Sequence, residues 1–588
     1  MADTLIPNTS LHDVASYGVL IDGKSLDPSF QLLSLSVTKE SNRVPIAKLV
    51  FRDGEAAEKK FALSNNTAFE PGKSIIIQVG RDAKNDQVFK GIITLHAIKV
   101  KANGNSELQV ECRDEAVRMT IGRHSKYYEQ LTDADLFGQL TSKYGLTVEA
   151  AVTGLKHKEI VQHHISDWDF MLLRAEANGM LVNVSDGKLK ISKPNTTANA
   201  VLTVTFGSSI LEFEGEMDAR NQWQSVKSTS WDYANQQLFT ASSSSSGLSE
   251  PGNIPGSQLA KAVKTDYEMH HSGHILEEEL QTWADGAMMR SRLAKIRGRA
   301  KVEGFSGIHP GDMVKIDGIS DRFNGNACVT GVRHDIGQGI WETQIQFGMH
   351  PEYHVKTYKD IADAPNAGLA GGIGGLQIGK VVQLQSDPDG EDRILVKIPT
   401  IDNDAQGIWT RVATLDAGAD RGSFFLPEIN DEVVIGFIND DPRHAVMLGM
   451  LHSSAKKAPI VAQDANDKKG FTTRSKMHFS FDDNTKTIVI DTPAGNSITI
   501  DEASTKIEIK DQNNNKITME PAGITLDSPK NIELKAGVNL TISAAATLSI
   551  KAASMSLKAD ADVSVQGAIA KLASQGITEV SGSIVKIN

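Results

Sequence analysis

The sequence predicts a mainly β protein of several domains, and three observations support this fold class. Short segments of alternating apolar and polar residues, separated by Gly, Asp, Asn and Pro, recur along most of the chain, as in strands joined by turns. The length of 588 residues suggests about three to five domains. All 33 aromatic residues lie at or before Phe481, so the last 107 residues contain none. Globular cores normally use aromatic rings, so we expect the C-terminal fifth to have a different architecture.

Composition excludes several classes of function. The net charge of −12 and the pI near 5.8 argue against a surface for polyanions, so nucleic acid is not an expected partner. Two cysteines, Cys112 and Cys328, are too few for a disulfide framework or a Cys-rich zinc site. The N-terminus lacks the basic and apolar regions of a signal peptide, and no apolar run reaches the roughly 18–20 residues of a membrane helix. We expect synthesis in the cytoplasm and any export by another route.

Residues 1–115 are predicted to form a first antiparallel barrel or sandwich, because six alternating segments are separated by turn residues. These segments are Gly18–Ile21, Leu33–Val37, Ala47–Phe51, Ser74–Val79, Phe89–Val100 and Leu108–Cys112. An α+β insertion is expected over residues 116–240. Its helices are predicted at Asp133–Tyr144 and Asp167–Asn178, the second ending at Gly179 as a C-cap. Strands follow near Met180–Ile191 and Val201–Phe206.

Residues 241–360 are predicted to hold a loop, a helix and a second barrel. The segment Ala241–Ser257, with five consecutive serines and two prolines, is typical of a flexible loop. A helix is expected over Leu276–Arg297, and strands with turns over Lys301–Gly348. Residues 361–378 are rich in Gly and Ala and are predicted to be a linker.

A small OB-like barrel of about five strands is predicted over residues 379–455, followed by a polar, Lys-rich linker over residues 456–470. Within this barrel, Trp409 and Arg411 allow two interpretations: contact with a partner, or Trp409 filling the barrel core. We adopt the second as the prediction.

Residues 471–588 are a repeat of apolar–polar–apolar triplets at spacings of 7 to 10 residues. The ten triplets are Ile488–Ile490, Ile498–Ile500, Ile507–Ile509, Ile517–Met519, Ile524–Leu526, Ile532–Leu534, Leu540–Ile542, Leu548–Ile550, Met555–Leu557 and Val563–Val565. This near-constant period is typical of a stacked β-solenoid. A disordered tail is the alternative, but disorder does not keep ten triplets in register.

Strands of about four to six residues are too short to enclose a core within one chain. Their aliphatic side chains are buried only if several identical chains intertwine into a prism, and a narrow interior explains the missing aromatics. About twelve strands at about 4.8 Å would give a needle on the order of 60 Å long. The predicted needle core includes Ile498, Ile507, Ile517, Ile532, Leu540, Leu548 and Val563.

Three short motifs suggest ligand chemistry, but each lacks a required residue. Pro71–Ser74 ends like a phosphate loop, yet Thr67 occupies the position of its first Gly. The acidic run Asp387–Asp392 has neither the spacing nor the terminal Glu of a calcium loop. The histidine cluster of residues 270–274 (His270, His271 and His274) lacks the Glu of a zinc-protease helix, and its role in metal binding stays open. We therefore expect no enzymatic activity, no cofactor and no established metal site.

A further set of motifs follows one order along nearly the whole chain. They are Phe69-x-Pro71-Gly72, Phe89-x-Gly91, Ser166-Asp167-Trp168-Asp169-Phe170 with Leu173, Arg174, Glu176 and Gly179, Ile308-His309-Pro310-Gly311, Val329-Thr330-Gly331-Val332-x-His334, Trp409-x-Arg411-Val412, Ala417-x-Ala419, Phe425-x-Pro427-Glu428, Asp431-Glu432-Val433 and Asp441-Pro442. In this order the chain resembles the VgrG spike proteins of type VI secretion and related contractile injection systems, including phage baseplate hub and spike fusions. Asn430 stands where the family usually has Gly, and Asn tolerates the left-handed backbone conformation.

The resemblance implies a homotrimer of two hub barrels with an α/β insertion, an OB-fold collar and an intertwined trimeric β-helix, the needle. It implies assembly on an Hcp-like hexameric inner tube, among baseplate proteins, with a PAAR-type tip, effector cargo and transient contact with a target-cell envelope. The protein would reside at the baseplate and be ejected on firing. The sequence does not distinguish a cell-anchored machine from a released particle.

Two alternative functions stay open from the sequence. One is a trimeric tail fibre that binds a receptor, although fibres usually end in an aromatic-rich head. The other is a spike that carries a cell-wall hydrolase, although the segment Leu451–Gly470, about nineteen residues, is too short for a catalytic domain between barrel and needle.

Overall fold

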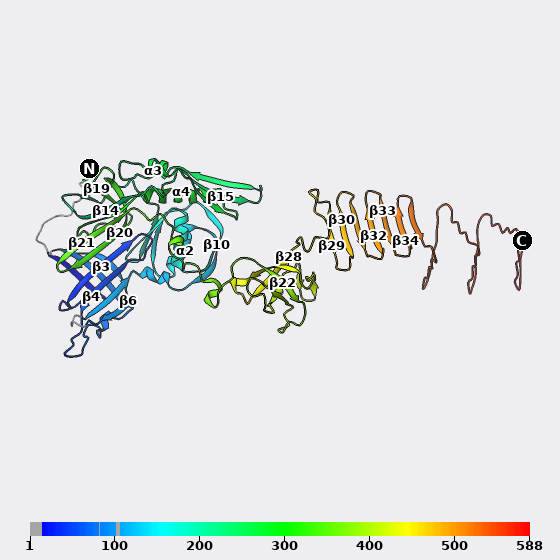
Figure 1. Ribbon diagram of the computed structural model, residues 1–588, viewed down its shortest axis with the longest axis horizontal. Helices are drawn as coiled ribbons and strands as arrows, with labels where there is room; N and C mark the ends of the chain where they lie inside the picture. The colour runs from blue at the N-terminus through cyan, green and yellow to red at the C-terminus, as the bar shows by residue number, and fades with distance from the viewer. Residues whose placement is uncertain (1–13, 82, 102–105, 588) are drawn as a thin grey trace. The chain divides into compact units, whose positions relative to one another are not determined.

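The computed structural model describes residues 14–81, 83–101 and 106–587, and the chain divides into two compact units, Met1–Gly449 and Met450–Asn588 (Figure 1). Among these described residues, no helix is long and apolar enough to cross a membrane.

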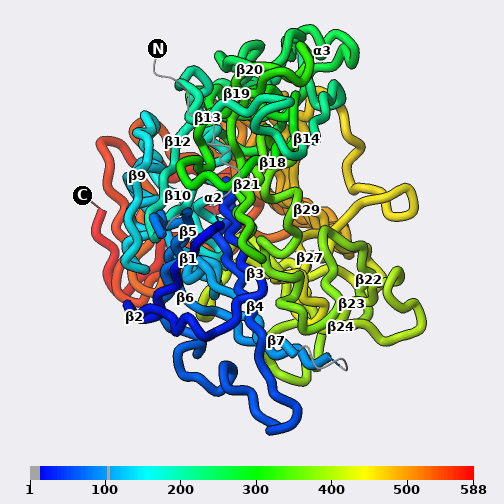
Figure 2. Tube along the Cα trace, turned by 90° about the vertical axis from the view of Figure 1, so that its left-hand side faces the viewer, coloured from blue at the N-terminus to red at the C-terminus, as the bar shows by residue number. Residues whose placement is uncertain are grey.

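A 13-stranded sheet dominates the first unit, and its N-terminal strands include all six predicted segments. These strands are β1 (Ala15–Ile21), β2 (Lys24–Ser25), β3 (Leu32–Glu40), β4 (Ile46–Arg52), β5 (Ser74–Arg81), β6 (Lys84–Lys99) and β7 (Glu107–Arg113), with the short helix η1 (Thr67–Phe69) before β5. They pair antiparallel, and Figure 2 shows β3, β4 and β7 side by side. Alternate residues such as Leu35, Phe51 and Phe89 point into one apolar core.

The second half of the same sheet comes from residues far along the chain. Its strands are β13 (Leu202–Thr205), β14 (Ile210–Met217), β18 (Ile296–Glu303), β19 (Met313–Asp317), β20 (Gly325–Gly337) and β21 (Ile340–Phe347). Strand β20 pairs antiparallel with β3, so the segments predicted as two barrels share one hydrogen-bonded sheet (Figure 1). They keep separate cores, the second of which contains Val302, Ile316 and Phe347.

The α+β insertion contains two helices whose ends follow from capping residues. Its elements are η2 (Glu115–Thr120), β8 (His124–Thr132), α1 (Asp133–Ser142), β9 (Thr147–Ala150), β10 (Lys156–Ile165), α2 (Asp167–Ala177), β11 (Leu181–Ser185) and β12 (Lys188–Ser192). Thr132 and Asp135 form a capping box at the start of α1, and Ser166 caps α2. Gly179 follows α2 at φ +66°, the left-handed conformation expected of its C-cap.

A layer of helices and a three-stranded sheet completes this part of the unit. It comprises β15 (Val226–Asp232), β16 (Gln237–Ser243), α3 (Gly256–Val263), β17 (Tyr267–His271), α4 (Glu277–Leu293) and α5 (His354–Thr357). Helix α4 ends at Leu293, so it is shorter at its C-terminal end than the helix predicted over Leu276–Arg297.

The predicted flexible loop over Ala241–Ser257 is partly ordered by specific contacts. Strand β16 extends into its beginning, and Glu250 Oε2 contacts the buried Lys295 Nζ at 2.8 Å. The same carboxylate accepts the Gly256 N–H, and Lys295 also donates to the carbonyl of Pro251. The serine-rich composition did not reveal this attachment, which depends on a lysine about 40 residues away.

A closed five-stranded barrel follows the first linker. Its strands are β22 (Gln377–Gln383), β23 (Ile394–Lys397), β24 (Ile408–Val412), β27 (Glu432–Phe437) and β28 (Ala445–Met450), accompanied by η3 (Pro365–Gly368), η4 (Ile438–Asp440) and the hairpin β25 (Ala417–Gly418) and β26 (Arg421–Gly422). Its core contains Val381, Val396, Val433 and Ile435.

The second unit contains a seven-stranded antiparallel meander, called the C-terminal sheet below. Its strands are β29 (Lys468–Thr472), β30 (His478–Asp482), β31 (Thr487–Asp491), β32 (Ser497–Asp501), β33 (Lys506–Lys510), β34 (Lys516–Glu520) and β35 (Gly523–Asp527). Each strand pairs with the next one along the chain (Figure 1). Beyond β35, residues 528–587 form no strand within the single chain.

Candidate functional site

The strongest candidate site is one face of the C-terminal sheet. Each of the strands β31 to β35 has five residues, with large apolar side chains at its second and fourth positions. The register aligns them across neighbouring strands: Ile500 is opposite Ile507, and Ile509 is opposite Ile517. Because side chains alternate along a strand, all of these apolar groups lie on the same face. We call this the aliphatic face.

The aliphatic face is uncovered in the single chain. On β34, Ile517 and Met519 are 36% and 40% exposed, whereas Thr518 between them, on the opposite face, is 9% exposed. This is the reverse of a sheet in a monomeric protein, where the apolar side chains are the covered ones. A contiguous apolar surface of this kind marks an interaction site.

The apolar rows continue beyond the sheet. Ile532, Leu540, Leu548 and Val563 are 55%, 59%, 56% and 56% exposed. The backbone at these four residues belongs to no strand within the chain. Backbone N–H and C=O groups need hydrogen-bond partners wherever water is excluded. The predicted needle-core residues therefore lie in uncovered rows along both parts of this unit.

Polar turns hold the register of the C-terminal sheet along one edge. Asn515 Nδ2 donates to Asp511 Oδ2 at 2.8 Å, and the Gln512 N–H donates to Asn496 Oδ1 at 3.1 Å. The hydrogen bonds from Asn515 lower the pKa of Asp511. Across the opposite edge, Lys486 and Glu502 pair at 2.9 Å. These contacts fix which apolar residues are opposite one another.

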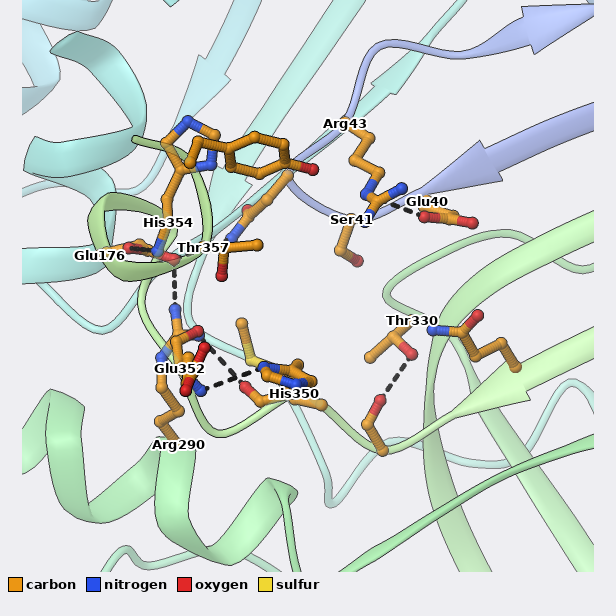
Figure 3. A pocket seen from close by; sticks show the side chains of 15 residues that line it. Glu40, Ser41, Arg43, Glu176, Arg290, Thr330, His350, Glu352, His354 and Thr357 are labelled. Atoms are coloured by element: carbon orange, nitrogen blue, oxygen red, sulfur yellow. Dashed lines mark hydrogen bonds and ion pairs between the residues drawn. The ribbon is translucent and has the colours of Figure 1, made fainter. Parts of the chain in front are cut away.

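A polar cavity of about 470 Å³ lies in the first unit (Figure 3). Arg290 pairs with Glu176 and donates to the Glu352 carbonyl at 2.7 Å, while Glu176 Oε2 accepts the His354 N–H at 2.9 Å. Arg43 and Glu40, which also line the cavity, pair with one another at 3.1 Å. Because these charged groups bind one another, the arrangement resembles a structural ion-pair network rather than a nucleophile with its base.

A second buried network joins α1, α2 and β10. Arg174 Nε donates to Asp133 Oδ1 at 2.7 Å, and His157 and Asn178 contact Asp133 Oδ2 at 3.0 and 2.9 Å. Burial alone would raise the pKa of Asp133, but the hydrogen bonds from His157 and Arg174 outweigh it and lower the pKa. This network holds the insertion together.

The motif residues of α2 have structural roles. Ser166 Oγ accepts the Asp169 N–H, and Phe170 is part of the insertion core. Asp167 is fully buried, and its carboxylate accepts hydrogen bonds from Gln162 at 2.7 Å and Lys143 at 3.0 Å. Burial would raise the pKa of Asp167, but these bonds lower it.

The motif residues of the small barrel mostly build its turns. Asp431 Oδ2 accepts the Glu428 N–H at 2.9 Å in the turn that joins Pro427 to Glu432 at the start of β27. Asn430 has φ +71°, so it takes the left-handed conformation that the usual Gly would take.

Asp441, which precedes Pro442, pairs with Arg443 at 2.7 Å, and the Arg443 guanidinium lowers the pKa of Asp441 to about 2. Asp441 therefore also helps to build a turn of the small barrel.

The prediction that Trp409 fills the core of the small barrel is wrong. On β24 the fully buried side chain is Thr410, while Trp409 is half-buried and Arg411 is exposed. Since side chains alternate along a strand, Trp409 and Arg411 share the outer face of the barrel.

The histidine cluster does not form a metal site in the described residues, where no group of three or more His, Cys, Asp or Glu side chains is arranged to hold an ion. His270 contacts Glu268 at 3.4 Å, and His274 lies 3.8 Å from Asp232. His271 instead shares hydrogen bonds with the backbone of Gly273.

Two family models match the chain. Residues 377–452, which include the closed barrel, match the type VI secretion system/phage-baseplate injector OB domain, and residues 11–338 match the Alg8 N-terminal domain.

Relatives of known class share shorter stretches. The type VI secretion system spike protein VgrG1b of Pseudomonas aeruginosa is 22% identical over 210 residues, which are 34% of this chain and 28% of that protein. VgrG3 of Vibrio cholerae, also a type VI secretion system spike protein, is 28% identical over 110 residues, which are 18% of this chain and 11% of that protein. The chain thus covers less than a third of the length of either relative. A tail protein of Neisseria meningitidis has a similar structure at 15% identity, with a TM-score of 0.44, covering 58% of this chain and 98% of that one.

The injector-domain match and the two spike relatives confirm the class that the ordered motifs indicated, a VgrG-type spike protein. Over residues 11–338, more than half of its length, the chain matches the Alg8 N-terminal domain model and belongs to that family.

Proposed function

We propose that this protein is the homotrimeric central spike of a contractile injection machine. The observation that carries the proposal is the aliphatic face, together with the exposed apolar rows that follow it. Three copies that bring these surfaces to a common axis would bury them in an aromatic-free core. The resulting needle would have no free sheet edge along its length, which favours stiffness and opposes aggregation.

In this proposal the 13-stranded sheet and its insertion form the hub, the small barrel forms the collar, and residues 471–588 form the needle. A contracting sheath would push the hub, and the load would pass through the collar to the needle and into the target envelope. The short strands β29 to β35 suit axial compression, because each of them pairs with a hydrogen-bonded neighbour.

The partners in this proposal are an Hcp-like hexameric inner tube at the hub, baseplate proteins, a PAAR-type tip on the needle, and effector cargo. The chain would be made in the cytoplasm, reside at the baseplate and be ejected on firing. The described ion-pair networks give no support for catalysis, and we propose a non-enzymatic carrier.

Deletion of residues 471–588 tests this function in the producing cells. If the chain is the spike, particles should fail to assemble or to carry a tip, although the first unit keeps its own cores. Normal particles that lose only attachment to the target would instead indicate a receptor-binding fibre. A cleared band on peptidoglycan zymography with the full-length protein would contradict the non-enzymatic role.

A further inference from the structure

A cationic cleft of about 370 Å³ lies between the β11–β12 hairpin and the loop before β19. Lys39 of β3 lines it, together with Lys188 and Lys190 of β12, Lys193 directly after β12 and His309 of the loop. These residues belong to three segments that are far apart in the sequence.

Lys39 occupies a position that the strand pattern reserves for the core. On β3 the buried positions are Leu35, Val37 and Lys39, and Lys39 is only 4% exposed. Its ammonium group donates to Ser185 Oγ at 3.1 Å. In the described part of the chain, no carboxylate oxygen lies within ion-pair distance of it.

Removing an ammonium group from water is costly unless an opposite charge compensates for it. The more distant Asp186 and Asp114 favour the charged form of Lys39, but burial outweighs them, and the pKa of Lys39 is lowered. Asp114 is itself occupied by the N–H groups of Ala116 and Gly187. Neither aspartate lines the cleft. The charge of Lys39 is therefore incompletely compensated within the protein.

The hairpin adds further positive charge on the same side. Leu189 and Ile191 of β12 face the insertion core, so Lys188 and Lys190 face the opposite way, into the cleft. Lys188 pairs with Glu149 at 2.8 Å, whereas Lys190 has no ion pair among the residues that the structure describes.

Four lysines thus line the cleft against two carboxylates, those of Glu149 and Asp312, in a chain whose net charge is −12. A local excess of positive charge on an acidic protein indicates a site for negative charge. The uncharged side-chain amide of Asn183 also lines the cleft. Its Oδ1 already accepts a hydrogen bond from Ser41 Oγ at 2.7 Å. Its NH₂ group remains a donor on a residue that lines the cleft.

We propose that this cleft binds a small, doubly charged oxyanion of the phosphate class, with Lys39 as its buried counter-charge and Lys190 and Lys193 at its entrance. Such a ligand would join the insertion to the large sheet and stabilise the first unit. The inference goes beyond the proposed spike function and does not depend on trimer formation.

Thermal unfolding and calorimetry with inorganic phosphate test the site on the full-length protein, against chloride at equal ionic strength. The unfolding temperature of the first unit should rise with phosphate. The variants K39M and K190Q/K193Q should bind phosphate about tenfold more weakly or worse, as expected for losing charge-assisted hydrogen bonds. The matched control K90Q/K315Q, which removes two exposed lysines on other strands, should bind like the wild type.

Absence of a phosphate-specific shift in the wild type would overturn the proposal. Unchanged binding by K190Q/K193Q would also overturn it, and this variant keeps the test valid if K39M fails to fold, because both of its lysines are exposed.

Discussion

The large sheet of the first unit and the C-terminal sheet share one sequence pattern but differ in what covers them. Both are mainly antiparallel, and both alternate apolar and polar residues. In the large sheet Val37 and Phe51 are fully buried, because other strands and the rest of the first unit pack over them. In the C-terminal sheet Ile498 and Ile509 remain more than two-fifths exposed. Within the described residues, the apolar side chains of the second sheet are therefore left partly uncovered.

This difference has a thermodynamic consequence. The first unit contains the partners of its own core, so its stability should not depend on protein concentration. In the proposed trimer, the needle gains its core only by association, so its stability should rise with concentration as mass action requires.

The largest expected effect comes from placing charge on the aliphatic face. The variant I507D/I517D should abolish the trimer at micromolar concentration, because carboxylates in a dry apolar core are strongly unfavourable. Light scattering would measure the mass. The matched variant T499D/T525D alters the opposite face of the same sheet and should stay trimeric. Loss of the trimer in both variants would contradict the assignment of the faces.

A cavity in the core of the large sheet should destabilise the first unit independently of protein concentration. Phe51→Ala should destabilise that unit by about 3–5 kcal/mol, because a fully buried ring is removed. Chemical denaturation would measure the change, which should be the same at low and high protein concentration. A strongly concentration-dependent loss would indicate that this core also depends on other copies.

The buried Asp133 network should make the first unit sensitive to acid. The pKa of Asp133 is lowered in the folded protein from an ordinary value of 3.8. Its stabilising contribution is therefore complete above that value and is lost as the pH falls through the lower folded pKa. Asp133→Asn should remove part of this dependence and destabilise the unit by about 1–3 kcal/mol near neutral pH. Denaturation of both proteins between pH 7 and pH 3 would measure it, and parallel curves would contradict the assignment.

The smallest expected effect is a conservative change in the needle. Ile517→Val should leave the trimer intact and cost about 0.5–1.5 kcal/mol for each chain, since one methylene is lost from a buried site. Thermal unfolding at several concentrations would detect it. The absence of any change would indicate that Ile517 stays as exposed as it is in the single chain.

Local signals predicted much of the fold. Ser166 and Gly179 defined the ends of α2, because a capping side chain and a left-handed glycine act within a few residues. The triplets from Ile488 to Leu526 form strands β31 to β35, because the alternation of apolar and polar residues is also a local signal. Whether such strands pair along the chain or between chains is not encoded in their period, so the antiparallel meander was not foreseen.

Non-local packing accounts for what the sequence did not reveal. The inward position on β24 belongs to Thr410 and not to Trp409, and barrel closure decides this register. The burial of Lys39 and Lys295 depends on hairpins and loops far away in the sequence. A signal for Lys39 existed, since it continues the inward alternation of Leu35 and Val37, but a lysine in that register is ordinarily assigned to the surface.

Sedimentation equilibrium of the full-length protein, from submicromolar to micromolar concentration, measures directly whether three chains associate. A trimeric spike should give a species of three times the chain mass of 63.5 kDa, with dissociation only at the lowest concentrations. A stable monomer at micromolar concentration would show that the aliphatic face remains uncovered in solution and would contradict the trimeric spike.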